Sequence, residues 1–153
     1  MIKWIDSKTE KRTITEKLLR SLPSWFGIES AIIDYVNDSE NLEMVAWIEN
    51  KEVVGFLAPK KTSSKAVSIH LMAVSKAYHH QGIGKKLFQE ALVKARKQGY
   101  KYYTVKTLDE KNTDVNYLKT RLFYERVGFE KLETFDTLWD ASNPCLLMIY
   151  LIN

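Results

Sequence analysis

Apolar residues form several short runs along the chain, some continuous and some alternating with polar residues. Such runs predict β-strands. They occur at residues 2–5, 44–48, 53–57, 66–74 and 102–108, from about residue 129, and at residues 146–152. The polar segment Glu49-Asn50-Lys51-Glu52 separates two of these runs, which predicts a β-hairpin.

In four other stretches, apolar residues recur every three or four positions, as on one face of a helix. Thr13 and Glu16 have capping-box spacing at the start of the first helix, and Pro23 ends it. Gly99 and Gly128 are placed to end the third and fourth helices. The four apolar faces are Ile14, Leu18, Leu19 and Leu22; Ile28, Ile32 and Val36; Ile83, Leu87, Phe88, Ala91, Leu92 and Ala95; and Val115, Leu118 and Leu122.

The resulting order is β-α-α-β-β-β-α-β-α-β-β. It predicts an α/β (α+β) protein with a mixed, mainly antiparallel sheet of about six to seven strands, about four flanking helices and one parallel crossover. No linker-like segment or internal repeat divides the 153 residues, so we expect one domain over residues 1–153.

The composition of the chain limits the ligands and the cellular location that we expect. The net charge is +4, which favours a solvated basic surface or attraction to an anion such as a nucleotide cofactor. The sequence contains no stripe of basic residues with interleaved aromatic residues, so nucleic acid is the less favoured anionic partner. The only cysteine, Cys145, excludes an intrachain disulfide and a cysteine-based metal cage, and we expect no metal. The start of the sequence lacks the apolar run of a signal peptide, and no stretch is long enough to span a membrane, so a cytoplasmic protein is expected.

The segment after the strand at 66–74 carries the clearest chemical signal. Gly82 and Gly84 lie between that strand and a helix, where free backbone N–H groups and the helix dipole attract anions. A tight turn without a ligand is the alternative interpretation. The segment is not a Walker A loop, because His79 stands at the position of that motif's first glycine. It is not a Rossmann fingerprint either, because Leu87 stands at the position of that motif's third glycine.

Residues 72–84 resemble motif A of the GNAT superfamily of N-acetyltransferases: a "Leu-Ala-Val"-like strand end, here Met72-Ala73-Val74, followed by [Gln/Arg]-x-x-Gly-x-[Gly/Ala]. Residues 123–129 resemble the "Tyr-x-x-x-Gly-Phe" motif B of the same family, with Tyr124 as its tyrosine. Two positions depart from the family pattern. His79 replaces the [Gln/Arg] residue, and Tyr117 stands where an asparagine is common.

The resemblance implies acetyl-CoA as co-substrate, held in a V-shaped opening between the strand ending at Val74 and the strand starting near Tyr102. Pantetheine would pair with the backbone of the first strand, and a backbone N–H near Ala73 or Val74 would stabilise the oxyanion. The pyrophosphate would lie on the loop and the first helical turn. The cofactor-binding residues implied are Met72, Ala73, Val74, His79, His80, Gln81, Gly82, Ile83, Gly84 and Lys85.

The resemblance makes Tyr124 the candidate general acid, because a tyrosine stays protonated at neutral pH and can donate to a thiolate. His70 is the candidate general base, since imidazole titrates near neutrality. The alternatives are that Tyr124 is only a buried residue of the core and that His70 has only a structural role in the sheet. Trp25 and Phe26 are candidate residues for binding the acceptor; alternatively, they only cover the hydrophobic core. Asp34 and Glu29 are further acidic candidates, or parts of a solvated helix face.

These observations predict an acyltransferase that moves acetyl from acetyl-CoA to a primary amine of a small molecule or peptide. Two alternatives stay open: a module that binds CoA without turnover, and a small basic nucleic-acid-binding domain. No nucleic-acid or membrane partner is expected. The apolar run at 146–152 permits a homodimer and suits a monomer's sheet equally well.

Overall fold

The computed structural model describes residues 1–153 and contains seven strands and four α-helices. The strands are β1 (Ile2–Trp4), β2 (Val45–Glu49), β3 (Glu52–Lys61), β4 (Ala66–Val74), β5 (Tyr102–Leu108), β6 (Glu130–Asp140) and β7 (Asn143–Leu151). The helices are α1 (Lys8–Arg20), α2 (Glu29–Ser39), α3 (Ile83–Lys97) and α4 (Val115–Val127), with a 3₁₀ turn, η1, at Lys76–Tyr78.

The strands follow the order β1-β2-β3-β4-β5-β7-β6 in one sheet. β4 and β5 pair in parallel over Ala66–Ser68. The pairs β1–β2, β2–β3, β5–β7 and β6–β7 are antiparallel. This is the mixed, mainly antiparallel α/β fold with one parallel crossover that the sequence predicts, and that prediction is confirmed. None of the helices is both long and apolar enough to cross a membrane.

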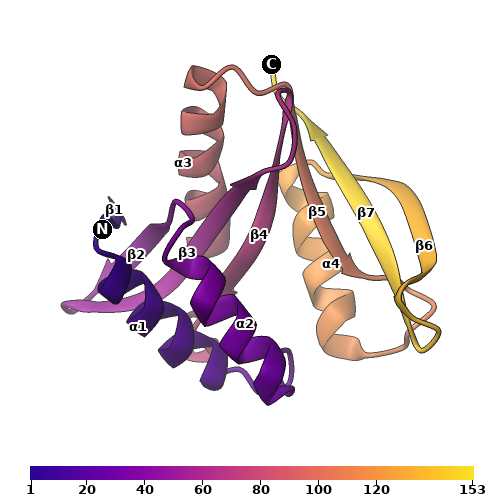
Figure 1. The fold of residues 1–153 in the computed structure, drawn as a ribbon, viewed down its shortest axis with the longest axis horizontal. Helices are drawn as coiled ribbons and strands as arrows, with labels where there is room; N and C mark the ends of the chain where they lie inside the picture. The colour runs from indigo at the N-terminus through magenta and orange to yellow at the C-terminus, as the bar shows by residue number, and fades with distance from the viewer. The chain divides into compact units, whose positions relative to one another are not determined.

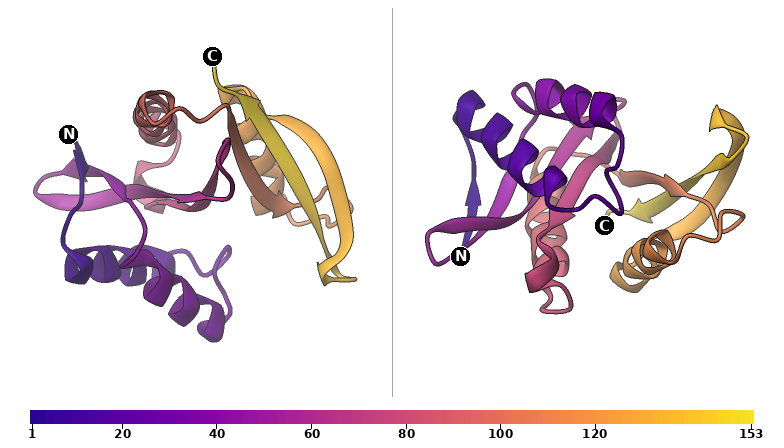
Figure 2. Two further views of the ribbon diagram at one scale, coloured as in Figure 1. Left: turned by 45° about the horizontal axis from the view of Figure 1, so that its top comes forward. Right: turned by 90° about the horizontal axis from the view of Figure 1, so that it is seen from below.

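The chain forms two compact units, and the first comprises Met1–Lys60 with Ile69–Gln98. In this unit α1 and α2 lie side by side on one face of β2, β3 and β4, and α3 covers the other face (Figures 1 and 2). The core beneath α1 and α2 is made of buried apolar side chains from both helices and from the strands. Its members include Leu18, Leu19, Ile32, Val36, Phe56 and Leu71.

The start of α1 differs from the prediction. Ser7, rather than Thr13, is the N-cap, and its hydroxyl accepts a hydrogen bond from the N–H of Glu10. Ser7 and Glu10 have the same capping-box spacing as Thr13 and Glu16. Thr13 instead lies inside the helix, where its hydroxyl donates to the carbonyl of Thr9. The helix therefore starts six residues earlier than predicted, which lengthens it by almost two turns.

Two more expectations for the first unit are resolved in opposite ways. The hairpin is confirmed: Glu49 pairs with Glu52, and Asn50 and Lys51 have positive φ, as in a two-residue type I′ turn. Ile28, expected on the buried face of the second helix, is the N-cap of α2 and is 67% exposed. Because an N-cap residue has extended backbone, its side chain leaves the helical face.

The second unit comprises Lys61–Ser68 and Gly99–Asn153, with α4 beside the strands β5, β7 and β6 (Figure 1). Asp114 caps α4 by accepting from the N–H groups of Asn116 and Tyr117. Gly128 ends the helix at φ 115°, where Tyr150 lies only 2.8 Å from the position of an added Cβ. Glycine is required there for both reasons.

The buried face predicted for α4 is wrong. Val115, Leu118 and Leu122 are exposed, while Arg121 and Tyr124 are buried. Arg121 donates a 2.7 Å hydrogen bond to the carbonyl of Leu108, which makes its burial possible. A pattern that ranks residues by polarity alone cannot anticipate a buried, paired arginine.

Asp109 is the buried carboxylate of the second unit. Burial works to raise its pKa, but hydrogen bonds from the Lys111 N–H and the Thr134 hydroxyl, with the charges of Lys111 and Arg121, outweigh burial and lower the pKa below 3.8. A group with a lowered folded pKa stabilises the protein above its unfolded pKa, and this contribution is lost as the pH falls through the folded pKa.

We expect Asp109→Asn to lower the free energy of unfolding at pH 7 by about 1–2 kcal/mol, because the variant keeps the shape but loses the charge. The difference from wild type should shrink below about pH 4, where the wild-type carboxylate becomes protonated. Urea unfolding at several pH values measures both effects. Asp136→Asn, at a largely exposed ion pair with Lys111, is the control and should change little. Equal stability of wild type and Asp109→Asn at pH 7 would contradict this account.

Candidate functional site

The loop between β4 and α3 has the features of an anion site. Gly82 is the N-cap of α3, in the left-handed region at φ 78°, and no side chain caps the helix. The N–H of Lys86 makes the first intrahelical bond, to the carbonyl of Gly82. The N–H groups of Ile83, Gly84 and Lys85 therefore have no partner within the helix. No protein atom lies within 4 Å of the position that a Cβ on Gly82 would take, so the surface beside this turn is open.

His79 and His80 shape the loop that leads to this helix. The ring Nε2 of His79 lies 2.7 Å from the carbonyl oxygen of Val74, so this nitrogen donates back to the end of β4. His80 has a positive φ of 64° and its ring packs against that of His79. His79 thus holds the turn closed with Nε2 and leaves Nδ1 for any other contact. Gln81, next in the chain, is exposed.

The two lysines in the first turn of α3 differ in their surroundings. Lys85 is exposed. Lys86 lies over the ring of Trp47, with its Nζ 4.8 Å from the ring centroid. The cation–π contact directs Lys86 toward β2, whereas Lys85 makes no such contact.

The end of β4 supplies the strand part of the site. Ala73 is buried, while Met72 and Val74 are half-buried. The N–H of Ser75, the next residue, donates to the carbonyl of Val54 and ties the strand end to β3. Gly55 allows a close approach beside it, because a Cβ there would lie 3.3 Å from side-chain carbons of Ile83 and Val74. The helix start and the strand end are therefore held together by packing.

His70, two residues before Met72 on β4, contacts α2. Its Nε2 lies 3.2 Å from Oδ2 of Asp38, and its ring packs edge-to-face against Tyr35 at 5.8 Å. Burial, together with the negative charge of Asp38, raises the pKa of Tyr35. Tyr35 therefore remains a neutral hydrogen-bond donor at physiological pH.

The aromatic turn after α1 links these two parts of the first unit. Trp25 packs edge-to-face against His79, with ring centroids 5.8 Å apart. Phe26 packs in the same way against Tyr35, which in turn contacts His70. Both residues of the turn are also half-buried against the core. Trp25 and Phe26 therefore cover the core and also contact His79 and Tyr35. Asp34, by contrast, is exposed on α2.

Tyr124 belongs to the second unit, whereas the glycine loop belongs to the first. Tyr124 is 7% exposed and its ring packs against those of Phe123 and Phe129. These contacts fix the ring on α4.

Sequence reasoning missed Asp38 and Tyr35. They lie three residues apart on α2, a spacing that could have placed them on one side of a helix. Their partner His70 is 32 residues from Asp38, however, and no local pattern connects the two.

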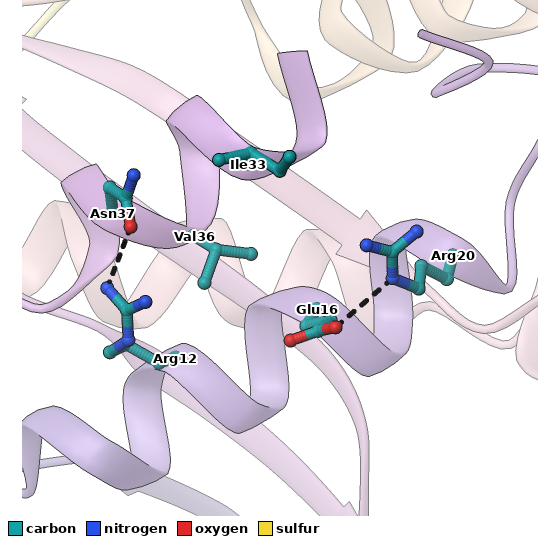
Figure 3. Close-up of a pocket in the computed structure, with 6 residues that line it drawn as sticks. All are labelled: Arg12, Glu16, Arg20, Ile33, Val36 and Asn37. Carbon is teal, nitrogen blue, oxygen red and sulfur yellow. Dashed lines mark hydrogen bonds and ion pairs between the residues drawn. The ribbon is translucent and has the colours of Figure 1, made fainter. Parts of the chain in front are cut away.

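A hollow lies between α1 and α2 (Figure 3). This groove has a volume of about 120 Å³. Its charged groups are paired: Arg12 donates to Asn37, and Arg20 to Glu16. Arg20 also makes a two-bond contact with Glu29, so the acidic candidate Glu29 is occupied by an arginine. The groove offers no nucleophile or free base. No cluster of three or more His, Cys, Asp or Glu side chains could hold a metal ion.

Solved structures similar to this chain define the class of fold. An acetyltransferase described as a member of the GNAT family from Desulfovibrio desulfuricans superposes with a TM-score of 0.85, at 15% identity over 100% of both chains. An aminoglycoside 6′-N-acetyltransferase complexed with coenzyme A gives 0.77, at 17% identity over 100% of this chain and 97% of the other. The corresponding enzyme from Enterococcus faecium gives 0.76, at 18% identity over 100% and 97%. The chain therefore shares the fold of these acetyltransferase structures.

A sequence comparison assigns the family. The profile of the acetyltransferase (GNAT) domain matches residues 40–131, more than half of the chain, which include both glycine-containing motifs. The chain belongs to the GNAT acetyltransferase family. A search of curated protein sequences finds no significant match.

Proposed function

We propose that residues 1–153 act as one catalytic domain that transfers an acetyl group from acetyl-CoA directly to a primary amine of a small molecule or peptide. The observation that carries this proposal is the uncapped N-terminus of α3, with Gly82 in the left-handed region and open space beside it. Such a turn accepts a pyrophosphate without a steric conflict. An aminoglycoside N-acetyltransferase of similar fold is complexed with coenzyme A, which supports the same ligand here.

In this proposal His79, His80, Gln81, Gly82, Ile83, Gly84 and Lys85 hold the pyrophosphate, chiefly through backbone N–H groups. Met72, Ala73 and Val74 hold the pantetheine, and a backbone N–H near Ala73 or Val74 stabilises the oxyanion. Donors of this kind contribute roughly 3–4 kcal/mol each in other acyl-transfer sites. Acetyl-CoA supplies the activated acetyl group.

The proton transfers need two side chains. His70 accepts a proton from the amine as its nitrogen bonds to the acetyl carbon. Tyr124 donates a proton to the departing sulfur as the carbon–sulfur bond breaks. Trp25, Phe26 and Asp34 contact the acceptor, for which aromatic rings and a carboxylate suit a cationic amine.

Calorimetric titration with acetyl-CoA tests the cofactor, and we expect saturable one-site binding. Turnover is then measured as thiol release with a panel of primary amines, including an aminoglycoside, a polyamine and a lysine-containing peptide. Burial raises the pKa of the Cys145 thiol, so the folded protein should add little background. No binding at millimolar acetyl-CoA would refute the proposal. Binding without turnover of any amine would indicate a CoA-binding module. Salt-dependent binding to DNA or RNA, without a response to CoA, would indicate the nucleic-acid alternative.

A further inference from the structure

His70 and Asp38 form a hydrogen-bonded pair between β4 and α2. The distance from the His70 Nε2 to the Asp38 Oδ2 is 3.2 Å. An ionised carboxylate only accepts hydrogen bonds, so Nε2 carries the proton in the neutral imidazole and Nδ1 has a free lone pair. Asp38 is the one hydrogen-bond partner of the ring, which leaves Nδ1 without a protein partner.

The surroundings restrict how this ring can move. Tyr35 packs edge-to-face against it at an interplanar angle of 70°, and Phe26 packs against Tyr35. The His70 side chain is 23% exposed and that of Asp38 is 51% exposed. The pair is thus half-enclosed by aromatic rings yet reaches solvent, as a group that exchanges protons must.

The side chains that contact the ring come from α2. Tyr35 and Asp38 face His70 from α2, and α2 itself contains no lysine or arginine. An imidazolium formed at His70 would therefore lie beside the Asp38 carboxylate.

We propose that Asp38 is a positioning residue for catalysis: it holds His70 as the Nε2–H tautomer, so that Nδ1 accepts the proton of the acceptor amine. This inference rests on the proposed function. As the amine nitrogen bonds to the acetyl carbon, its proton passes to Nδ1, and the charged ring keeps its hydrogen bond to Asp38. His70 lies two residues before Met72, about 7 Å along the strand. It is therefore on the same strand, β4, as the residues proposed to hold the pantetheine.

The kinetic test compares three variants with an amine that the wild type acetylates. Asp38→Ala should lower kcat about 10-fold or more while the KM for acetyl-CoA stays within twofold. Asp38→Asn keeps an oxygen acceptor for Nε2 and should retain most of the activity. Glu40→Ala removes a carboxylate from the end of the same helix, where it pairs with Arg12, and should behave as wild type. An Asp38→Ala variant as active as Glu40→Ala would overturn the proposal.

The spectroscopic test needs no acceptor. With ¹⁵N-labelled histidine at about pH 8, where a free imidazole is neutral, the wild-type His70 should show a protonated Nε2 and an unprotonated Nδ1. His70→Gln identifies the signals among the three histidines. In Asp38→Ala both nitrogens should shift toward the average of two tautomers, and an unchanged pattern would overturn the proposal. Failure of the proposed function would appear differently, as a wild type that binds no acetyl-CoA or acetylates no amine.

Discussion

Replacement of Gly82 by aspartate is expected to abolish measurable acetyl-CoA binding. Gly82 precedes the free N–H groups of α3, and an added carboxylate would compete for them and repel the pyrophosphate. Together these effects should weaken binding by at least about 100-fold, equivalent to about 2.7 kcal/mol. Gly84→Asp, one residue into the first turn, adds a second negative charge, and the double variant should show no heat of binding at millimolar acetyl-CoA.

Gly99→Asp provides a matched control. Gly99 also has a positive φ, 84° against 78° for Gly82, and neither position has a protein atom within 4 Å of an added Cβ. The two substitutions therefore impose similar backbone strain and the same charge, at opposite ends of α3. Their melting temperatures should fall by similar amounts, while only Gly82→Asp loses binding. If both variants bound acetyl-CoA like the wild type, the glycine loop would not be the cofactor site.

Tyr124→Phe is expected to lower kcat by about 100-fold, because the departing thiolate loses its proton donor. The phenylalanine keeps the ring that packs against Phe123 and Phe129, so the fold should survive. The affinity for acetyl-CoA, measured by calorimetry, should stay nearly constant. This combination would identify an enzyme whose chemistry, rather than cofactor binding, depends on the hydroxyl.

Tyr102→Phe is the control for this experiment. Tyr102 lies on β5 in the same unit and is 38% exposed, so it reports the general effect of removing a phenolic hydroxyl. Equal turnover by Tyr124→Phe and Tyr102→Phe would exclude Tyr124 as the general acid. A parallel loss of acetyl-CoA affinity in Tyr124→Phe would instead make it a binding residue.

Elements specified by local patterns were predictable from the sequence. The buried face of α3, from Ile83 to Ala95, matches the prediction residue by residue, because six apolar side chains repeat at the helical period. Gly99 follows the last turn of α3 with positive φ, and the bounds of β4 and β5 are also as predicted. In each case the signal lies within a few residues of the structure that it specifies.

The features of the candidate site also differ in whether a local sequence pattern specifies them. The glycine loop could be recognised because a strand, two glycines and a helix occur within one short segment. The role of His79 could not, since its hydrogen bond to Val74 depends on how the loop folds back. The pairing of Lys86 with Trp47 likewise joins residues far apart in the chain. Only the folded structure shows that Lys86, and not Lys85, lies over an aromatic ring.

By itself, the sequence determined the order of the strands and helices, the position of the glycine turn before α3 and the family of the protein, because hydrophobic periodicity, glycine and capping residues act over a few neighbouring positions. The tertiary structure alone decided which side of α4 is buried and that His70 meets Asp38. Both outcomes depend on polar groups finding partners from distant segments, Leu108 for Arg121 and α2 for His70. Whether a polar side chain is buried depends on the hydrogen-bond partner that folding brings to it, and that partner is not among its neighbours in the sequence.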